Sequence, residues 1–373
     1  MRISLSLLAV VFLCVSSAFA ADPVGLDLGA DLPSFKLPSV DDKTYTEKDF
    51  ADAKILLIIF TCNHCPTAQA YEDRIIKLDA DYREKGVRLI AISPNADSAV
   101  RLDELGYSEF NDSLPEMKLR AKHRDFKFPY LYDGETQAFS RQVGVKATPQ
   151  VFVFDAGRKL RYIGRIDDAD VGEVTSHDTR NALDDLLAGR EVKTAKTRSF
   201  GCSTKWAEKV DGVKEADEKW AKLEVTLAKA DLDAVKKIAA NDSENFVLIN
   251  LWATWCGPCV HEFPQLVTMQ RMFGKRHFKM VTISFDAADA EPKALKFLKE
   301  KQAAQMTNLL WTGGDKDKLA EALDAKWEGP IPHTILIAPG GKIVYRKAGP
   351  FDAVEVKRAI VDQIGRTYAS KKK

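Results

Sequence analysis

The chain has 373 residues, of which 45% are hydrophobic and 29% charged, and its formal net charge is +1. This length exceeds what one hydrophobic core usually organises, so two folded units are expected. The near-zero charge gives no electrostatic case for nucleic acid or an anionic membrane surface as a partner.

The N-terminus has the pattern of a secretory signal peptide. Arg2 precedes a short apolar run, and the stretch ends in the small-residue motif Ala18-Phe19-Ala20. Residues 1–20 are therefore predicted to be removed on export, with the periplasm as the destination. Because no second apolar stretch of spanning length follows, we expect no membrane span in the mature chain.

The first half of the mature chain predicts an alternation of strands and helices. Apolar residues 55–60 have the length and branching of a buried strand, and the helix that follows should stop at Gly86. After a second strand, a polar and partly helical insertion is expected over residues 94–128. Thr148-Pro149 then precedes a hairpin and a closing helix.

The second half repeats this order of elements. A strand over residues 245–252 leads to a cysteine pair, a helix through Arg276 and another strand, and Ile331-Pro332 precedes a second hairpin and a last helix. The repeat predicts an α/β protein with two sheets in tandem. Each sheet should have a parallel portion followed by an antiparallel hairpin, with helices on its faces.

Residues 203–240 are predicted to be a charged helical linker between domains at 21–202 and 241–373. Apolar side chains seven residues apart give the linker one stripe, formed by Trp206, Val213, Trp220 and Leu227. We expect this stripe to pack on one or both domains. A dimerising helix is the alternative, and the oligomeric state is left open.

Five cysteines remain after the predicted cleavage, namely Cys62, Cys65, Cys202, Cys256 and Cys259. Four of them form two C-x-x-C pairs at junctions of strand and helix, a pattern that favours thiol chemistry over a disulfide scaffold. Attack on a disulfide requires a thiolate, which the positive end of a helix stabilises. The first cysteine of each pair is expected to attack and the second to resolve the mixed disulfide.

The second half resembles the thioredoxin fold. This resemblance is carried by WCGPC with Trp255, by Ile331-Pro332 and by the order of elements, while CVHEFP and PGGKIVYR are similar to the exported TlpA/ResA branch. In that family the proline is cis and lies against the active-site disulfide. The resemblance assigns this role to Pro332 and, in the first half, to Pro149.

Two positions beside the second pair bear on proton transfer. Thioredoxin has a buried aspartate six residues before its first cysteine, where this chain has Asn250, so that proton acceptor is missing. ResA-like proteins have a glutamate three residues after the second cysteine, and Glu262 matches it. By resemblance, Glu262 handles the proton of Cys259, although an ordinary solvent-facing glutamate is the alternative.

The first half resembles the redoxin or peroxiredoxin-like group of the same fold. A peroxiredoxin needs Pro-x-x-x-Thr-x-x-Cys, and counting back from either Cys62 or Cys65 finds neither the threonine nor the proline. Peroxide reduction is therefore an alternative function. A second alternative is copper binding, as in Sco-like proteins, with His64, His123 or His177 as a ligand beside the cysteines.

The two spacers differ in a way that predicts different reduction potentials. His64 makes the first spacer similar to those of protein disulfide isomerase and DsbA, whereas the second spacer is that of thioredoxin. The predicted function is an exported thiol–disulfide oxidoreductase that acts on protein clients and takes electrons from a thiol donor. Its redox-active groups would be the disulfides Cys62–Cys65 and Cys256–Cys259, with no cofactor and no metal.

The sequence leaves three functional questions open. Electrons are expected to pass from the second pair to the first or on to Cys202, or else the two domains act independently. Cys202 is either a third redox thiol or a small buried residue. A non-catalytic binding module, with the insertion over residues 94–128 docking a partner, is the remaining alternative.

Overall fold

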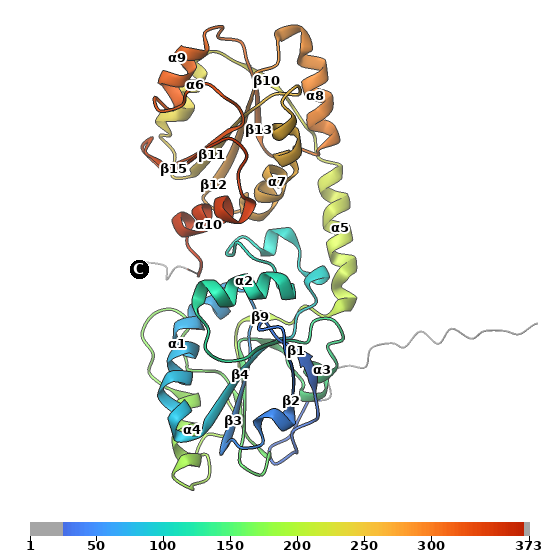
Figure 1. The fold of residues 1–373 in the computed structure, drawn as a ribbon, viewed down its shortest axis with the longest axis vertical. Coiled ribbons are helices and arrows are strands. Elements are labelled where there is room, and N and C mark those ends of the chain that lie inside the picture. Colours follow the sequence, from blue (N-terminus) through green and yellow to red (C-terminus); the bar gives the residue numbers. More distant parts are fainter. Residues whose placement is uncertain (1–24, 369–373) are drawn as a thin grey trace, which may run out of the picture.

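The computed structural model describes residues 25–368, so the expected signal peptide lies outside the described residues. Two α/β units are stacked along the long axis of the molecule, and helix α5 (Val210–Ala221) runs beside their junction (Figure 1). Each unit has its own mixed sheet with helices around it, which confirms the expected fold class.

The first unit is built on a five-stranded sheet in the order β5-β4-β3-β7-β8. Strands β3, β4 and β5 run parallel, and β7 and β8 are antiparallel to their neighbours. The strands are β3 (Ile55–Phe60), β4 (Val87–Ser93), β5 (Tyr130–Tyr132), β7 (Gln150–Phe154) and β8 (Leu160–Gly164). The helices are α1 (Pro66–Tyr82), α2 (Leu114–Arg124), α3 (Ala138–Val143) and α4 (Asp178–Leu187).

Strand β3 is central, and alternate side chains enter two different core clusters. Leu57 and Ile59 pack with helix α1, whereas Ile58 and Phe60 pack with helix α3. All six residues are buried, as the apolar run in the sequence predicts. The strand therefore holds the cysteine pair that follows it at a fixed edge of the sheet.

Two short ladders flank this sheet. Strand β1 (Lys36–Pro38) pairs with β2 (Thr44–Thr46), and β6 (Ala147–Thr148) pairs antiparallel with β9 (Cys202–Ser203). The second ladder places Cys202 opposite Thr148, although the two residues are far apart in the sequence.

The second unit has a six-stranded sheet in the order β10-β13-β12-β11-β14-β15. The strands are β10 (Ala228–Ala230), β11 (Phe246–Trp252), β12 (Phe278–Ser284), β13 (Thr307–Trp311), β14 (His333–Ile337) and β15 (Ile343–Ala348). The helices are α6 (Leu232–Ala240), α7 (Gly257–Phe273), α8 (Glu291–Glu300), α9 (Lys316–Leu323) and α10 (Ala353–Ile364).

The prediction that residues 203–240 form a linker is wrong for the second part of that range. Strand β10 pairs in parallel with β13 at the edge of the second sheet, and Val235 of α6 is buried in the core of that unit. The three residues of β10, Ala-Lys-Ala, have little strand propensity of their own, so the pairing comes from the neighbouring strand.

The apolar stripe of the connecting segment packs on both units. Trp206 lies under the guanidinium of Arg141 in the first unit, 4.4 Å from it. Trp220 packs on the core of the second unit and donates a hydrogen bond to the Gln302 carbonyl at 2.9 Å. Among residues 25–368, no helix is long and apolar enough to cross a membrane.

The insertion over residues 94–128 lies between the two units and contacts the second one. Val100 and Leu105 join a hydrophobic cluster of the second unit. Glu109, which is fully buried, forms ion pairs with Arg358 and Arg366 near the end of the chain. The insertion, which one alternative had docking a separate partner, thus packs on the second unit of the same chain.

Candidate redox-active cysteine sites

The second cysteine pair lies where β11 leads into α7. Cys256 is the N-cap of α7, and the structure has a disulfide between Cys256 and Cys259. The Cys256 sulfur lies 3.8 Å from the carbonyl oxygen of Ile331, which precedes the cis proline Pro332. The proline and the disulfide are therefore neighbours, as the resemblance implies.

Glu262 lies one helical turn after Cys259 and is buried. Its Oε1 accepts a hydrogen bond from Asn250 Nδ2 at 3.1 Å, and its Oε2 accepts one from the Phe351 amide at 3.2 Å. Burial outweighs these two hydrogen bonds and raises the pKa of Glu262 to about 7. A carboxyl with this pKa can hold or release a proton at neutral pH.

The second pair is open to solvent at its N-terminal side. Trp255 is 61% exposed, and the spacer residues Gly257 and Pro258 are exposed as well. His261 is exposed on α7, where a surface residue was expected. The side chains around Cys256 are therefore exposed, although Cys256 and Cys259 themselves are buried.

The first pair lies at the equivalent junction, between β3 and α1, but it is buried. The Cys62 sulfur is 3.1 Å from Thr148 Oγ1, and the Cys65 sulfur is 3.5 Å from the Thr148 carbonyl oxygen. Thr148 precedes the cis proline Pro149, and both cysteines are at most 3% exposed. The two pairs thus share a backbone setting, and all four cysteines are buried. They differ in their spacers, because Gly257 and Pro258 are exposed whereas Asn63 and His64 are buried.

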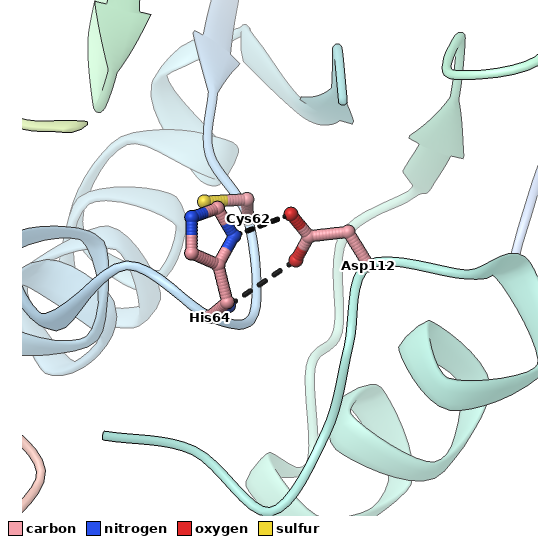
Figure 2. Close-up of side chains that lie close together, drawn as sticks. All are labelled: Cys62, His64 and Asp112. Atoms are coloured by element: carbon pink, nitrogen blue, oxygen red, sulfur yellow. Dashed lines mark hydrogen bonds and ion pairs between the residues drawn. The ribbon is translucent and has the colours of Figure 1, made fainter. Parts of the chain in front are cut away.

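His64, in the first spacer, forms a buried ion pair that the sequence did not predict (Figure 2). Its Nδ1 lies 2.6 Å from Asp112 Oδ2, and Asn95 Nδ2 donates to the same oxygen at 2.7 Å. Asp112 Oδ1 accepts the amides of Asn63 and His64. Asp112 lies in the insertion, 48 residues after His64, and no spacing rule in the sequence connects the two.

Each member of this ion pair stabilises the charge of the other. Burial alone would lower the pKa of His64, but the charge and hydrogen bond of Asp112 outweigh it and raise the pKa. Burial would likewise raise the pKa of Asp112, but His64 and Asn95 lower it. Asp112 therefore favours the protonated form of His64 beside the cysteines.

The two thiols of the first pair are not equivalent. Burial raises the pKa of Cys62 well above its usual value. Burial also acts on Cys65, but hydrogen bonds from the Cys202 and Cys62 thiols and the charge of His64 together lower its pKa well below the usual value. These electrostatics favour Cys65 as the thiolate, whereas Cys62 was expected to be the attacking residue.

Cys62, His64 and Asp112 also offer donor atoms within 4.8 Å of one another, a spacing that a metal ion could bridge. Both oxygens of Asp112 already accept two hydrogen bonds each, so this carboxylate serves to hold His64. The other two histidines named for copper lie elsewhere: His123 is beside Glu109, and His177 is the N-cap of α4.

The two sites handle protons with different residues. The positions equivalent to Asn250 and Glu262, counted from each cysteine pair, hold Leu56 and Ala68 in the first unit. Both are buried and neither can carry a proton. The His64–Asp112 pair is therefore the charged group that the first site offers in place of a buried glutamate.

The structure does not bring the two cysteine pairs together. Helix α7 has 17 residues and is therefore about 25 Å long, with Cys256 at its N-terminus. Its other end contacts the insertion of the first unit, where a Cβ at Gly106 would meet the Met272 carbonyl oxygen. The second pair thus lies at the end of α7 that points away from the first unit.

Comparison with known proteins gives the family. The Redoxin family model matches residues 27–183 and 221–363, so each unit is matched separately. ResA, a thiol-disulfide oxidoreductase of Bacillus subtilis, is 31% identical over 98 residues, which are 26% of this chain and 50% of ResA. DsbE, a thiol:disulfide interchange protein of Allochromatium vinosum, is 31% identical over 106 residues, 28% of this chain and 52% of DsbE. The chain spans about half the length of these curated relatives.

Among solved structures, an uncharacterised conserved protein of Geobacillus kaustophilus is 35% identical, with a TM-score of 0.43. The match covers 48% of this chain and 92% of that protein. A hypothetical protein of Sinorhizobium meliloti is 31% identical with a TM-score of 0.44, over 49% of this chain and 96% of that one.

Proposed function

The chain belongs to the redoxin family, and we propose that it is an exported thiol–disulfide oxidoreductase with two redox-active C-x-x-C sites. The observation that carries this proposal is the second site. There, a disulfide with an exposed spacer at a helix N-terminus lies against a cis proline and one turn from Glu262, whose pKa is raised to about 7.

At this second site the reduced Cys256 thiolate attacks a client disulfide. The helix N-terminus stabilises the thiolate, and a mixed disulfide forms as one client sulfur leaves. Cys259 then attacks Cys256, which releases the second client sulfur and restores the disulfide. Glu262 takes the proton of Cys259 in this resolving step, because it is buried nearby and its pKa lies close to neutrality.

The first site is proposed to be the more oxidising of the two. A cation beside Cys65 stabilises its thiolate, and a stabilised thiolate makes the reduced form of a pair more stable. The proposed clients are protein disulfides, and a thiol donor outside the cytosol would reduce the second pair. Support for the oxidoreductase activity comes from the names of the relatives, ResA and DsbE.

The proposal is tested by the reduction of a model protein disulfide with full-length protein and a thiol donor. Three proteins are compared: the unchanged chain, Cys256→Ser/Cys259→Ser and Cys62→Ser/Cys65→Ser. We expect the second-pair variant to lose at least roughly a hundredfold in rate, because the nucleophile is gone. Unchanged activity in that variant would reject the second pair as the client-facing site.

Peroxide reduction and copper binding stay predictions. The positions where a peroxiredoxin has its proline and threonine hold Ile55, Ile58 and Ile59, which are buried side chains of β3, and Cys62 itself. The same set of variants, assayed for loss of hydrogen peroxide with a thiol donor, tests that alternative. Peroxide turnover that depends on Cys62 or Cys65 would favour it over disulfide exchange.

A further inference from the structure

The first cysteine pair has a strand of the same chain beside it. Strand β9 pairs antiparallel with β6, and the register sets Cys202 opposite Thr148. Thr148 is also the residue that touches both sulfurs of the pair, through Oγ1 to Cys62 and through its carbonyl oxygen to Cys65. Any extended peptide that adds to the edge of β6 therefore brings a side chain next to these sulfurs.

Residues on both sides of Cys202 hold this strand in place. The Thr204 amide donates to the Lys146 carbonyl at 3.2 Å, and the Lys205 amide donates to Asn95 Oδ1 at 2.8 Å. Gly201 has a φ of +144°, and a Cβ there would come within 2.0 Å of the Thr148 carbonyl oxygen. The close approach of β9 to β6 thus requires glycine at this position.

The three sulfurs form one cluster with Cys65 at its centre. Cys62, Cys65 and Ala68 make a buried cluster on which Cys202 packs. The side chains of Cys62 and Cys202 both influence the pKa of Cys65, so all three sulfurs lie in one neighbourhood. Cys65 is therefore the sulfur that either neighbour can reach.

We propose that residues 200–204 occupy the peptide-binding edge of β6 as a built-in client, and that Cys202 exchanges with the Cys62–Cys65 disulfide to form Cys65–Cys202. This inference rests on the proposed function, because it takes the Cys62–Cys65 disulfide as its starting state. The kind of partner that this edge fits is an extended, cysteine-containing segment, and the chain supplies that segment itself.

The exchange is balanced without an external oxidant. Cys202 gives up its proton as it attacks the Cys65 sulfur, the Cys65–Cys202 bond forms, and the Cys62–Cys65 bond breaks. Cys62 leaves as a thiolate and takes up the proton that Cys202 gave up. One disulfide and one thiol are present before and after the step, so the two isomers of the first site have the same oxidation level.

The first test maps disulfides in the full-length chain with Cys256→Ser/Cys259→Ser as background. Cys62→Ser and Cys65→Ser are each added, the protein is oxidised with glutathione disulfide, and free thiols are alkylated before peptide mass spectrometry. We expect a Cys65–Cys202 link in most Cys62→Ser molecules, and at least roughly tenfold less Cys62–Cys202 link in Cys65→Ser. Glutathionylated Cys65 without a link to Cys202 would overturn the proposal.

The second test moves the strand and keeps every cysteine. Gly201→Ala pushes β9 away from Thr148, whereas Gly212→Ala on α5 is the matched control, because a Cβ there meets nothing within 4 Å. We expect alkylation of the reduced first pair to become roughly tenfold faster in Gly201→Ala only, because the buried thiols are uncovered. Equal alkylation rates in the two variants contradict a covering role for β9.

The two proposals fail in different ways. If the unchanged chain reduces client disulfides while Cys62→Ser never links Cys65 to Cys202, the built-in client is wrong and the oxidoreductase stands. If the Cys65–Cys202 link forms but no variant affects client reduction, the oxidoreductase activity is wrong and the exchange within the first site stands.

Discussion

Burial has opposite outcomes at the two carboxyl groups that serve the cysteine sites. Glu262 has an amide side chain and a backbone amide as partners, so burial prevails and its pKa rises to about 7. Asp112 has a cationic partner in His64, so its pKa falls despite complete burial. One site therefore has a group that exchanges protons at neutral pH, and the other has a fixed ion pair.

The Glu262→Gln variant tests the role of the first of these groups. In the unchanged chain, resolution of the mixed disulfide should quicken as pH rises through about 7, because ionised Glu262 accepts the Cys259 proton. Glutamine cannot accept it, so we expect this inflection to vanish and the rate at pH 7.5 to fall roughly tenfold or more. Stopped-flow kinetics in the Cys62→Ser/Cys65→Ser background measures it.

Stability gives an independent check on the same residue. The pKa of Glu262 is higher in the folded state than in the unfolded state. Ionisation therefore destabilises the fold as the pH rises from the unfolded-state pKa to the folded-state pKa of about 7. The unchanged chain should lose on the order of 2–3 kcal/mol between pH 4.5 and pH 8 relative to Glu262→Gln. Parallel urea titrations of the two proteins across this range would show no such difference if Glu262 were solvated.

The Asp112→Asn variant removes the partner of His64. A neutral His64 no longer stabilises the Cys65 thiolate, so the first pair should become more reducing by tens of millivolts. Glutathione equilibration in the Cys256→Ser/Cys259→Ser background measures the potential. Asp133→Asn is the matched control, because Asp133 is equally buried but bonds to Ser140. If both variants shift the potential equally, the effect of Asp112 is only structural.

Some residues of the two cysteine sites can be predicted from the sequence close to the cysteines, and others cannot. Cys256, Glu262 and His64 follow from spacing along one helix or one loop, and the structure places each beside its pair. Asp112 was missed because it reaches His64 from a loop 48 residues away. Contacts between segments so far apart depend on the packing of whole elements, which a single sequence does not encode in a readable pattern.

At the scale of secondary-structure elements, the sequence predicted the strands that have long apolar runs. It did not predict the short strands that form by pairing with a neighbouring strand. Strands β3 and β11 each follow from six buried residues in a row, with a helix after each. Strands β9 and β10 have two and three residues, and they exist because a neighbouring strand offers free hydrogen-bonding groups. The β6–β9 ladder, which covers the first site, belongs to this second kind.

Helix α10 and the residues after it fasten the second unit to the insertion of the first. Arg366 and Arg358 pair with buried Glu109, so Arg366→Ala should leave a poorly compensated buried charge and destabilise the chain by about 2–4 kcal/mol. Glu109→Gln/Arg366→Ala should recover part of this loss. Urea unfolding of the full double-mutant cycle measures the coupling, with the exposed pair Lys77 and Asp81 as the control.

A coupling near zero in that cycle would mean that the ion pair does not hold the two units together. The control pair lies on one face of α1 and is solvent-exposed, so Lys77→Ala should change stability by less than roughly 0.5 kcal/mol.

At the scale of the whole molecule, the arrangement opposes direct electron transfer between the two pairs of one chain. The second pair is at the far end of α7 from the insertion, whereas the first pair lies beside Asp112 of the insertion. Exchange between the pairs therefore needs either a second molecule or separation of the units. Each domain should then act as a distinct enzyme in dilute solution.

Mixing experiments test whether the two cysteine pairs of one chain exchange electrons directly. The Cys62→Ser/Cys65→Ser variant is reduced at Cys256 and Cys259. It is then mixed with the Cys256→Ser/Cys259→Ser variant, which is oxidised at Cys62 and Cys65. We expect exchange between the two proteins to be second order, and the unchanged chain to show no faster first-order phase. A concentration-independent phase in the unchanged chain would establish a relay within one molecule.

The pairing of Glu109 with Arg366 spans 257 residues, which sets an order of events during synthesis. Domains generally fold from the N-terminus as the chain emerges, so Glu109 is in place long before Arg366 exists. Until then Arg120, 3.8 Å away on α2, provides the nearby positive charge. A chain that ends before residue 366 lacks this partner of Glu109, so truncated products should be less stable and more readily degraded than the full chain.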